Sequence, residues 1–304
     1  MIEAILVGAV RGGTSMVFAG VGETIAERAG VINLGTEGSM LAGALAAYAV
    51  GIETGNPWLG AAAGLVAGMM LSLVHGYLVI ARRANQIATG LAVTFLGLGL
   101  TSLFGQDYVS QGVEPFEAIA VWGLADIGFI GPILFDHDPL TYLSFAIAPA
   151  AWWMLHRTGL GLRIRAAGER PDVLATMGTA PDRVRWIAVA MGGALAGVGG
   201  AQLATAFART WSENMVAGRG FIAVALVIFA GWNPITIVAG AYLFSGAVAF
   251  QLELQARGSD ISIFALDAIP YVAVIVVLAA LSGRRRFAGP EALDAVFDAG
   301  ERSN

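Results

Sequence analysis

The 304-residue sequence contains no cysteine and no lysine, and charged residues make up only 13% of it. Without cysteine the chain forms no disulfide and offers no thiolate to a metal. Without lysine it has no Walker A loop, because that loop needs a lysine to reach the β- and γ-phosphates of a nucleotide. Lysine bases and Schiff bases are excluded for the same reason. We therefore expect no ATPase site in this chain and no cofactor bound to it.

Residues typical of catalytic and metal sites are equally sparse. The three histidines, His75, His137 and His156, are scattered, no HExxH motif occurs, and no serine stands at a glycine-flanked elbow. His137 has an aspartate on either side, but an acidic surface turn explains that arrangement better than a metal site does. We predict no enzymatic activity and no metal site in this chain. We also predict no nucleic-acid binding, because the arginines follow the pattern of a membrane protein.

What the chain does have is apolar residues, at 57% of the sequence, and the mean hydropathy is +0.73. Soluble domains carry about 25% charge, so the composition indicates an integral membrane protein. Its 41 glycines are typical of closely packed transmembrane helices. The sequence predicts an all-α, polytopic transmembrane helical bundle with eight or nine spans, near residues 5–22, 38–52, 58–81, 87–105, 140–156, 186–207, 220–231, 235–250 and 267–283.

The distribution of arginine predicts the orientation of the bundle. Placing 82–86, 157–185 and 284 onward in the cytoplasm puts 12 of the 17 arginines inside, and Arg28, after the first span, makes 13. The opposite loops hold Arg209, Arg219 and Arg257, together with acidic residues. This arrangement gives an external N-terminus and a cytoplasmic C-terminus. We divide the chain into a transmembrane domain, 1–290, whose cytoplasmic loop is 157–185, and a cytoplasmic tail, 291–304.

The loop 157–185 is unusually rich in arginine for an internal segment of such a chain. Pro171 and Asp172 suit the first turn of a helix, and Gly178 suits the position just past its end. The pattern predicts about two turns along the membrane surface, with Val173, Leu174 and Met177 as an apolar face. Two interpretations stay open, a docking surface for a cytoplasmic partner and a solvated basic loop.

Polar residues also interrupt the apolar runs at residues 22–38, which hold Glu23, Glu27, Asn33 and Glu37. Glycines around Asn33 predict a tight non-helical turn, followed by a helix with Glu37 in its first turn. Polar groups beside hydrocarbon need partners, since an unpaired one costs several kcal/mol. The alternative is an ordinary cytoplasmic hairpin with normal capping.

Further polar side chains are candidates for a translocation pathway, though bonding back to their own helices is an equal alternative. They open the span after Arg82-Arg83, or lie in span 186–207: Asn85, Gln86, Thr89, Thr94, Gln202 and Thr205. The break at 231–234, Gly-Trp-Asn-Pro, separates two short apolar segments and is predicted to sit at membrane depth. Glycines four apart, Gly60, Gly64 and Gly68, and Gly193 and Gly197, predict close helix crossings.

The sequence of residues 27–38, ERAGVINLGTEG, resembles a signature of the ABC-importer permeases of the ribose and branched-chain amino acid superfamily. Its N-L-G-x-E-G form is similar to the nucleoside (simple-sugar) branch, which works with basic membrane lipoproteins. Residues 168–178, 192–197, 218–225 and 231–234 agree with the same pattern. Together these stretches cover most of residues 20–250 in order.

The resemblance implies one permease subunit of an ATP-driven importer in the inner membrane, moving a nucleoside or related simple sugar by alternating access. Its implied partners are a second permease, an ATPase that holds ATP and magnesium, an extracytoplasmic binding lipoprotein and membrane lipid. A heterodimer is expected, with a homodimer as the alternative. The implied coupling residues are Gly168, Glu169, Arg170, Pro171, Asp172, Leu174, Met177 and Gly178. The candidate pathway residues are Asn33, Glu37, Asn85, Gln86, Thr89, Thr94, Gln202, Trp232 and Asn233.

An ion-coupled secondary transporter of a small polar solute is the alternative of another class. Such a protein needs buried ionisable groups at mid-span, and the sequence offers few.

Overall fold

The computed structural model describes residues 1–109, 111–258, 261–282 and 289–293. Within them the chain is helical apart from loops and one antiparallel pair of two-residue strands. The elements are α1 (Ile2–Arg28), α2 (Thr36–Thr54), α3 (Pro57–Gly76), η1 (Tyr77–Ala81), α4 (Gln86–Gly105), η2 (Gln106–Tyr108), β1 (Ile119–Ala120), α5 (Gly131–Leu134), β2 (Asp136–His137), α6 (Pro139–Arg157), α7 (Gly159–Glu169), α8 (Pro171–Thr176), α9 (Pro181–Gln202), η3 (Leu203–Phe207), α10 (Arg219–Phe229), α11 (Pro234–Ala256) and α12 (Ile263–Ser282).

The predicted polytopic helical membrane protein fits this structure. Among the described residues, five helical stretches are long and apolar enough to cross a bilayer: Ile2–Arg28, Pro57–Ala81, Gln86–Tyr108, Pro181–Phe207 and Pro234–Ala256. Two shorter apolar helices are Arg219–Phe229 and Ile263–Val276. The total of eight or nine spans stays a prediction.

Local residues explain where three of the long helices begin. Asn56, Asp138 and Asn233 each precede a proline, and each side chain accepts a hydrogen bond from a backbone N–H of the first turn. Proline is favourable there because its missing N–H would have no partner inside the helix. An Asn or Asp cap supplies an acceptor that the first turn otherwise lacks.

The centre of the bundle is built from α1, α2, α3 and α9, which cross closely through glycine. A Cβ added to Gly68 on α3 would lie 2.6 Å from the carbonyl oxygen of Gly193 on α9. One added to Gly64 would lie 2.7 Å from the Gly43 carbonyl oxygen on α2. Side chains do not fit at such contacts, and the helix backbones therefore touch directly. The packing interpretation of these glycines is confirmed.

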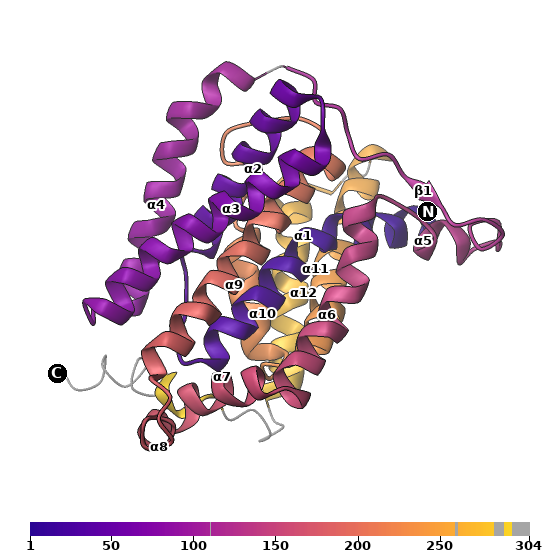
Figure 1. Cartoon of the computed structure of the whole chain (residues 1–304). Helices are drawn as coiled ribbons and strands as arrows, with labels where there is room; N and C mark the ends of the chain where they lie inside the picture. Colours follow the sequence, from indigo (N-terminus) through magenta and orange to yellow (C-terminus); the bar gives the residue numbers. More distant parts are fainter. Residues whose placement is uncertain (110, 259–260, 283–288, 294–304) are drawn as a thin grey trace.

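The connecting segments gather at two opposite ends of the bundle (Figure 1). One end carries α7 and α8, and we call it the α8 end. There Arg83 pairs with Asp182 at 2.8 Å and Arg170 with Glu291 at 3.2 Å. The N-terminus, β1 and α5 lie at the other end. The loops predicted to share a side therefore do cluster, while which end faces the cytoplasm stays a prediction.

Residues 157–185 contain two helices, α7 and α8, where the sequence predicts a single short helix. α7 precedes α8 and contains Gly168 and Glu169, so the arginine-rich stretch is mostly helical. α11 is also longer than the expected segment 235–250, because it extends to Ala256. Residues 284–286, the arginines that fixed the predicted C-terminal side, lie outside the described residues.

The start of the predicted tail packs against the bundle at the α8 end. Leu293 is only 1% exposed and lies in a cluster with Ile32 and Trp232. Next to it, Ala292 meets Gly30, where an added Cβ would come within 2.8 Å of the Ala292 Cβ. We call residues 289–293 the C-terminal segment. The boundary at 291 stays a prediction, and residues 294–304 lie outside the described part.

Candidate functional site

α8 presents an apolar surface from a fixed base. The helix begins at Pro171, as predicted, and the chain turns away at Gly178, whose φ is 78°. Leu174 is 4% exposed and packs into the core, whereas Val173 is 48% exposed and Met177 is 76% exposed. Leu174 thus anchors the helix, and the other two apolar side chains stay free to meet a partner.

The base of α8 contacts the end of α1. Gly168, near the end of α7, approaches the turn after α1 so closely that an added Cβ would lie 3.1 Å from the Gly30 nitrogen. Arg185 of α9 donates from Nε to the Ala29 carbonyl and from Nη2 to the Ala167 carbonyl, each at 3.2 Å. One side chain therefore joins the end of α1 to the end of α7.

The end of α1 is joined in turn to the break between α10 and α11. Arg28 donates to the carbonyl oxygens of Trp232 at 3.2 Å and Gly231 at 3.3 Å. The indole Nε1 of Trp232 donates to Glu27 Oε2 at 2.6 Å. Trp232 has a φ of 53°, a conformation that costs a non-glycine residue energy and persists only when its surroundings hold it. These bonds fix the irregular backbone of the break.

Asn33 lies at the centre of a buried polar cluster. The chain turns back after α1 at Gly30, so the Asn33 N–H donates to Glu23 Oε1 at 2.7 Å. Thr36 donates to the other carboxylate oxygen at 2.9 Å. The Asn33 side chain donates to Ser72 at 3.1 Å and accepts from the Gly35 N–H at 2.9 Å. The predicted non-helical turn is confirmed, and Glu37 does lie in the first turn of α2.

Side chains from α3 and α4 satisfy the backbone of this turn. Gln86 accepts from the Ile32 N–H at 2.7 Å and donates to the Gly30 carbonyl at 3.2 Å. Thr94 donates to the Leu34 carbonyl at 2.9 Å. His75, which the sequence did not single out, places Nε2 2.9 Å from the Ile32 carbonyl oxygen. Irregular backbone inside a bilayer needs such partners.

Glu37 caps a helix that begins inside the bundle. Its two carboxylate oxygens accept from the Gly218 and Gly220 N–H groups, each at 2.7 Å. A helix N-terminus carries unpaired N–H groups and partial positive charge, which a carboxylate neutralises. A Cβ added to Gly220 would lie 2.8 Å from Glu37 Oε2, so glycine is needed at that contact. Gly218 and Gly220 on either side of Arg219 were the sequence signal for this close contact.

The remaining candidate pathway residues serve other local roles in this structure. Asn85 caps α4 by accepting from the Ala88 N–H, and Thr89 donates back to the Asn85 carbonyl. Asn233 caps α11. Gln202 donates to the Arg11 carbonyl at 3.1 Å. The structure thus brings Asn33, Gln86 and Thr94 to one turn. Trp232 and Asn233 lie together in the break before α11, and Glu37 and Gln202 lie elsewhere. Their part in a pathway stays a prediction.

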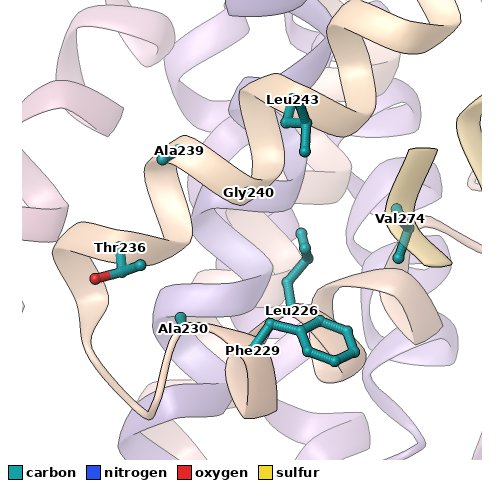
Figure 2. A pocket seen from close by; sticks show the side chains of 8 residues that line it. All are labelled: Leu226, Phe229, Ala230, Thr236, Ala239, Gly240, Leu243 and Val274. Carbon is teal, nitrogen blue, oxygen red and sulfur yellow. The ribbon is translucent and has the colours of Figure 1, made fainter. Parts of the chain in front are cut away.

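An apolar pocket of about 270 Å³ lies between α10, α11 and α12 (Figure 2). Leu226, Phe229 and Leu243 line it, and Thr236 is the polar side chain among its labelled residues. Such a lining offers a polar solute almost no hydrogen-bond partners. This pocket therefore suits hydrocarbon rather than a translocated sugar or nucleoside.

Comparison with known proteins identifies the family. The chain is 33% identical to a guanosine ABC transporter permease of Bacillus subtilis, over 88% of this chain and 89% of the relative. It is 34% identical to a nucleoside ABC transporter permease of Lactococcus lactis, over 89% and 90%. A putative glucose ABC transporter permease of Haloferax volcanii is 43% identical over 81% and 76%. No solved structure matches the chain.

The relatives and the apolar helices together indicate a multi-pass protein of the plasma membrane. Residues 5–281 match the family described as branched-chain amino acid transport system / permease component. This match covers nearly the whole helical bundle, with the polar turn, α8 and the break before α11 inside it. The chain therefore belongs to this family of ABC transporter permeases.

Proposed function

We propose that this chain is the permease subunit of an ABC importer that moves a nucleoside or a related simple sugar across the plasma membrane by alternating access. Relatives named for guanosine and for nucleosides support this substrate class. Because another relative is named for glucose, the proposed substrate class also includes simple sugars. ATP hydrolysis would take place on a separate ATPase, and an extracytoplasmic lipoprotein would deliver the solute. A second permease would complete the membrane unit, as a heterodimer.

The observation that carries the mechanism is the continuous set of contacts from α8 to the break before α11. Movement of α8 would reach the end of α1 through Gly168 and Arg185. From there Arg28 and the Glu27–Trp232 hydrogen bond would carry it to α10 and α11. In this proposal α8 is the coupling helix, with Val173 and Met177 inserted into the ATPase. Glu169, Arg170 and Asp172 would form its exposed polar rim.

The buried carboxylates bear on the ion-coupled alternative, because that mechanism needs buried ionisable groups at mid-span. Glu23, Glu27 and Glu37 are all buried, more than the sequence alone led us to expect. Each accepts at least one hydrogen bond from a structural donor. They therefore fit a role in holding turns and helix ends, and the relatives favour the ATP-driven mechanism.

The coupling role is tested with Met177→Asp in the complete transporter reconstituted in proteoliposomes. A charge at the centre of an apolar contact should reduce solute uptake about tenfold or more while the complex still inserts. The matched control is Leu162→Asp, which adds the same charge at an exposed apolar position of α7. Normal uptake per ATP hydrolysed in Met177→Asp would overturn the coupling role.

A further inference from the structure

Arg11 and Arg219 form no ion pair among the described residues, and both line cavities of the bundle. Arg11 lies in α1 and Arg219 begins α10. Arg219 donates from Nη1 to the carbonyls of Met215 and Val216, at 3.2 and 3.1 Å. Its Nε and Nη2 form no hydrogen bond in the described part of the chain, and the Glu37 carboxylate attracts the guanidinium without forming an ion pair. An ionisable group inside a membrane bundle marks a functional site by default.

Both arginines line cavities, and the two cavities adjoin. The outer one, of about 630 Å³, is lined by Glu3, Arg11 and Phe207 among others. The inner one, of about 80 Å³, is more enclosed and is lined by Arg219, Ser245 and the same Phe207. Gly8 also lines both. A route therefore leads from the end that carries the N-terminus, past Phe207, to Arg219.

Close packing of α1 and α11 shapes the inner cavity. A Cβ added to Gly12 would lie 2.6 Å from Ser245 Oγ and 3.4 Å from the Phe207 ring. One added to Gly8 would lie 2.9 Å from the Ala249 Cβ. Side chains at the two glycines would therefore close the space between the helices. The size of the inner cavity admits one edge of a nucleoside, and the outer one can hold the rest.

The chemistry of this site selects its ligand. A guanidinium only donates hydrogen bonds, so its ligand must present acceptors. The Nε–Nη2 edge of Arg219 offers two parallel donors, which match the O6 and N7 acceptors of a 6-oxopurine. Adenine presents a donor at position 6 instead, opposed to the arginine. The Phe207 ring is partly exposed at the junction and offers a face for base stacking.

We propose that Arg219 and Phe207 form a contact site for the base of a 6-oxopurine nucleoside, such as guanosine or inosine, on its way through the permease. The proposal rests on the proposed function, because it assumes that the chain transports nucleosides. It adds that Arg219 selects the substrate and that the O6–N7 edge of the base is what Arg219 recognises. Arg11 lies on the outer part of the same route and would meet the ligand first.

The test compares uptake of inosine and adenosine, which share the ribose and N7 and differ at position 6 and in the proton on N1. The complete transporter is reconstituted with wild-type chain, Arg219→Met, Arg219→Lys and the control Arg209→Met, an exposed arginine of the same loop. We expect the wild type to prefer inosine. Arg219→Met and Arg219→Lys should lower inosine uptake about tenfold through KM and leave adenosine uptake almost unchanged. The Lys variant keeps the charge but lacks the paired donors, and it carries the test if Arg219→Met does not assemble.

The outcomes separate the two proposals. A wild type that takes up neither inosine nor adenosine overturns the contact site, and one that also takes up no pyrimidine nucleoside refutes the nucleoside part of the proposed function itself. A wild type that transports both, with an inosine-to-adenosine ratio that no Arg219 variant changes, overturns the contact site alone. Equal loss of both substrates in the variants also overturns it, because that indicates a structural role.

The absence of cysteine provides a direct probe of the route. Val7→Cys places a single thiol in the lining of the outer cavity. Inosine should slow labelling of this thiol by a polar maleimide more than adenosine does, and Arg219→Lys should remove the difference. A thiol that is blocked in the assembled transporter without any solute would show that the second permease fills the cavity, and would overturn the proposal.

Discussion

The two ends of the bundle use their arginines differently. At the α8 end, Arg28 and Arg185 spend their donors on backbone carbonyls of neighbouring elements. Toward the other end, Arg219 donates only to carbonyls of the loop just before it, Arg11 forms no ion pair among the described residues, and both line cavities. Paired groups resist rearrangement because breaking them leaves a buried donor or acceptor unsatisfied. This difference supports the two proposals, that the α8 end transmits motion and that the opposite end admits a solute.

Glu37 connects the two regions, and its loss should have the largest effect. Glu37→Leu leaves the Gly218 and Gly220 N–H groups unsatisfied inside the bundle. We expect a loss of roughly 3 kcal/mol in stability and no measurable uptake. Thermal unfolding of the purified protein in detergent measures the first and transport assays the second. Glu37→Gln, which keeps one acceptor oxygen, should lie between; a fully stable Glu37→Leu protein would contradict the capping role.

Disruption of the link between α1 and the break before α11 should uncouple the transporter. Trp232→Phe keeps the aromatic packing but removes the donor to Glu27. Removing the donor leaves a buried carboxyl oxygen without its partner, which costs about 1–3 kcal/mol, and we expect uptake per ATP to fall about tenfold. Trp186→Phe is the control, because Trp186 packs beside Val189 without a hydrogen bond from its indole in the described structure. An equal fall in both variants would refute the link.

The C-terminal segment should strengthen the α8 end by a smaller amount. Leu293→Ala removes most of a buried leucine that packs on Ile32 and Trp232. Partial collapse of an end segment should limit the cost to about 2 kcal/mol, at the low end for such truncations. Proteolysis near residue 289 should accelerate, and uptake should change by a few-fold at most. Glu291→Ala, at an exposed position, is the comparison variant; unchanged proteolysis in Leu293→Ala would refute the packing.

The smallest effect is expected for an exposed ion pair at the same end. Arg83 and Asp182 lie 2.8 Å apart, but their side chains are 64% and 43% exposed. Such pairs contribute about 0–1 kcal/mol. Arg83→Met should therefore leave uptake within about twofold of the wild type, whereas Arg185→Met should reduce it more, because Arg185 holds two backbone carbonyls. Equal losses of uptake in Arg83→Met and Arg185→Met would show that the burial of Arg185 does not make it more important than Arg83.

Features set by neighbouring residues could be predicted from the sequence. Pro171 and Gly178 fixed the ends of α8, and the glycines around Asn33 fixed the turn before α2. Glycines four apart predicted the crossing of α3 and α9. In each case the conformation depends on the properties of a few adjacent residues or on one helix face, so no knowledge of the rest of the fold was needed.

Partners distant in the sequence could not be predicted. Glu37 meets Gly218 across 181 positions, and Trp232 meets Glu27 across 205. Such pairs follow from the packing of whole helices, which no local pattern contains. α7 was missed because its arginines and glycines resemble a loop, although it is helical over Gly159–Glu169. Arg219 was counted only as a charge on an outer loop, since nothing nearby shows that it enters the bundle.

The packing of the C-terminal segment has a practical consequence for work with this protein. Glu291 pairs with Arg170 just before α8, so the segment lies beside the proposed coupling helix. A fluorescent protein or affinity tag fused shortly after Leu293 would begin close to the start of α8, where, under the proposed function, it would compete with the ATPase. Reporters are better placed at the opposite end of the molecule, and a loss of transport in a C-terminal fusion should first be attributed to obstruction.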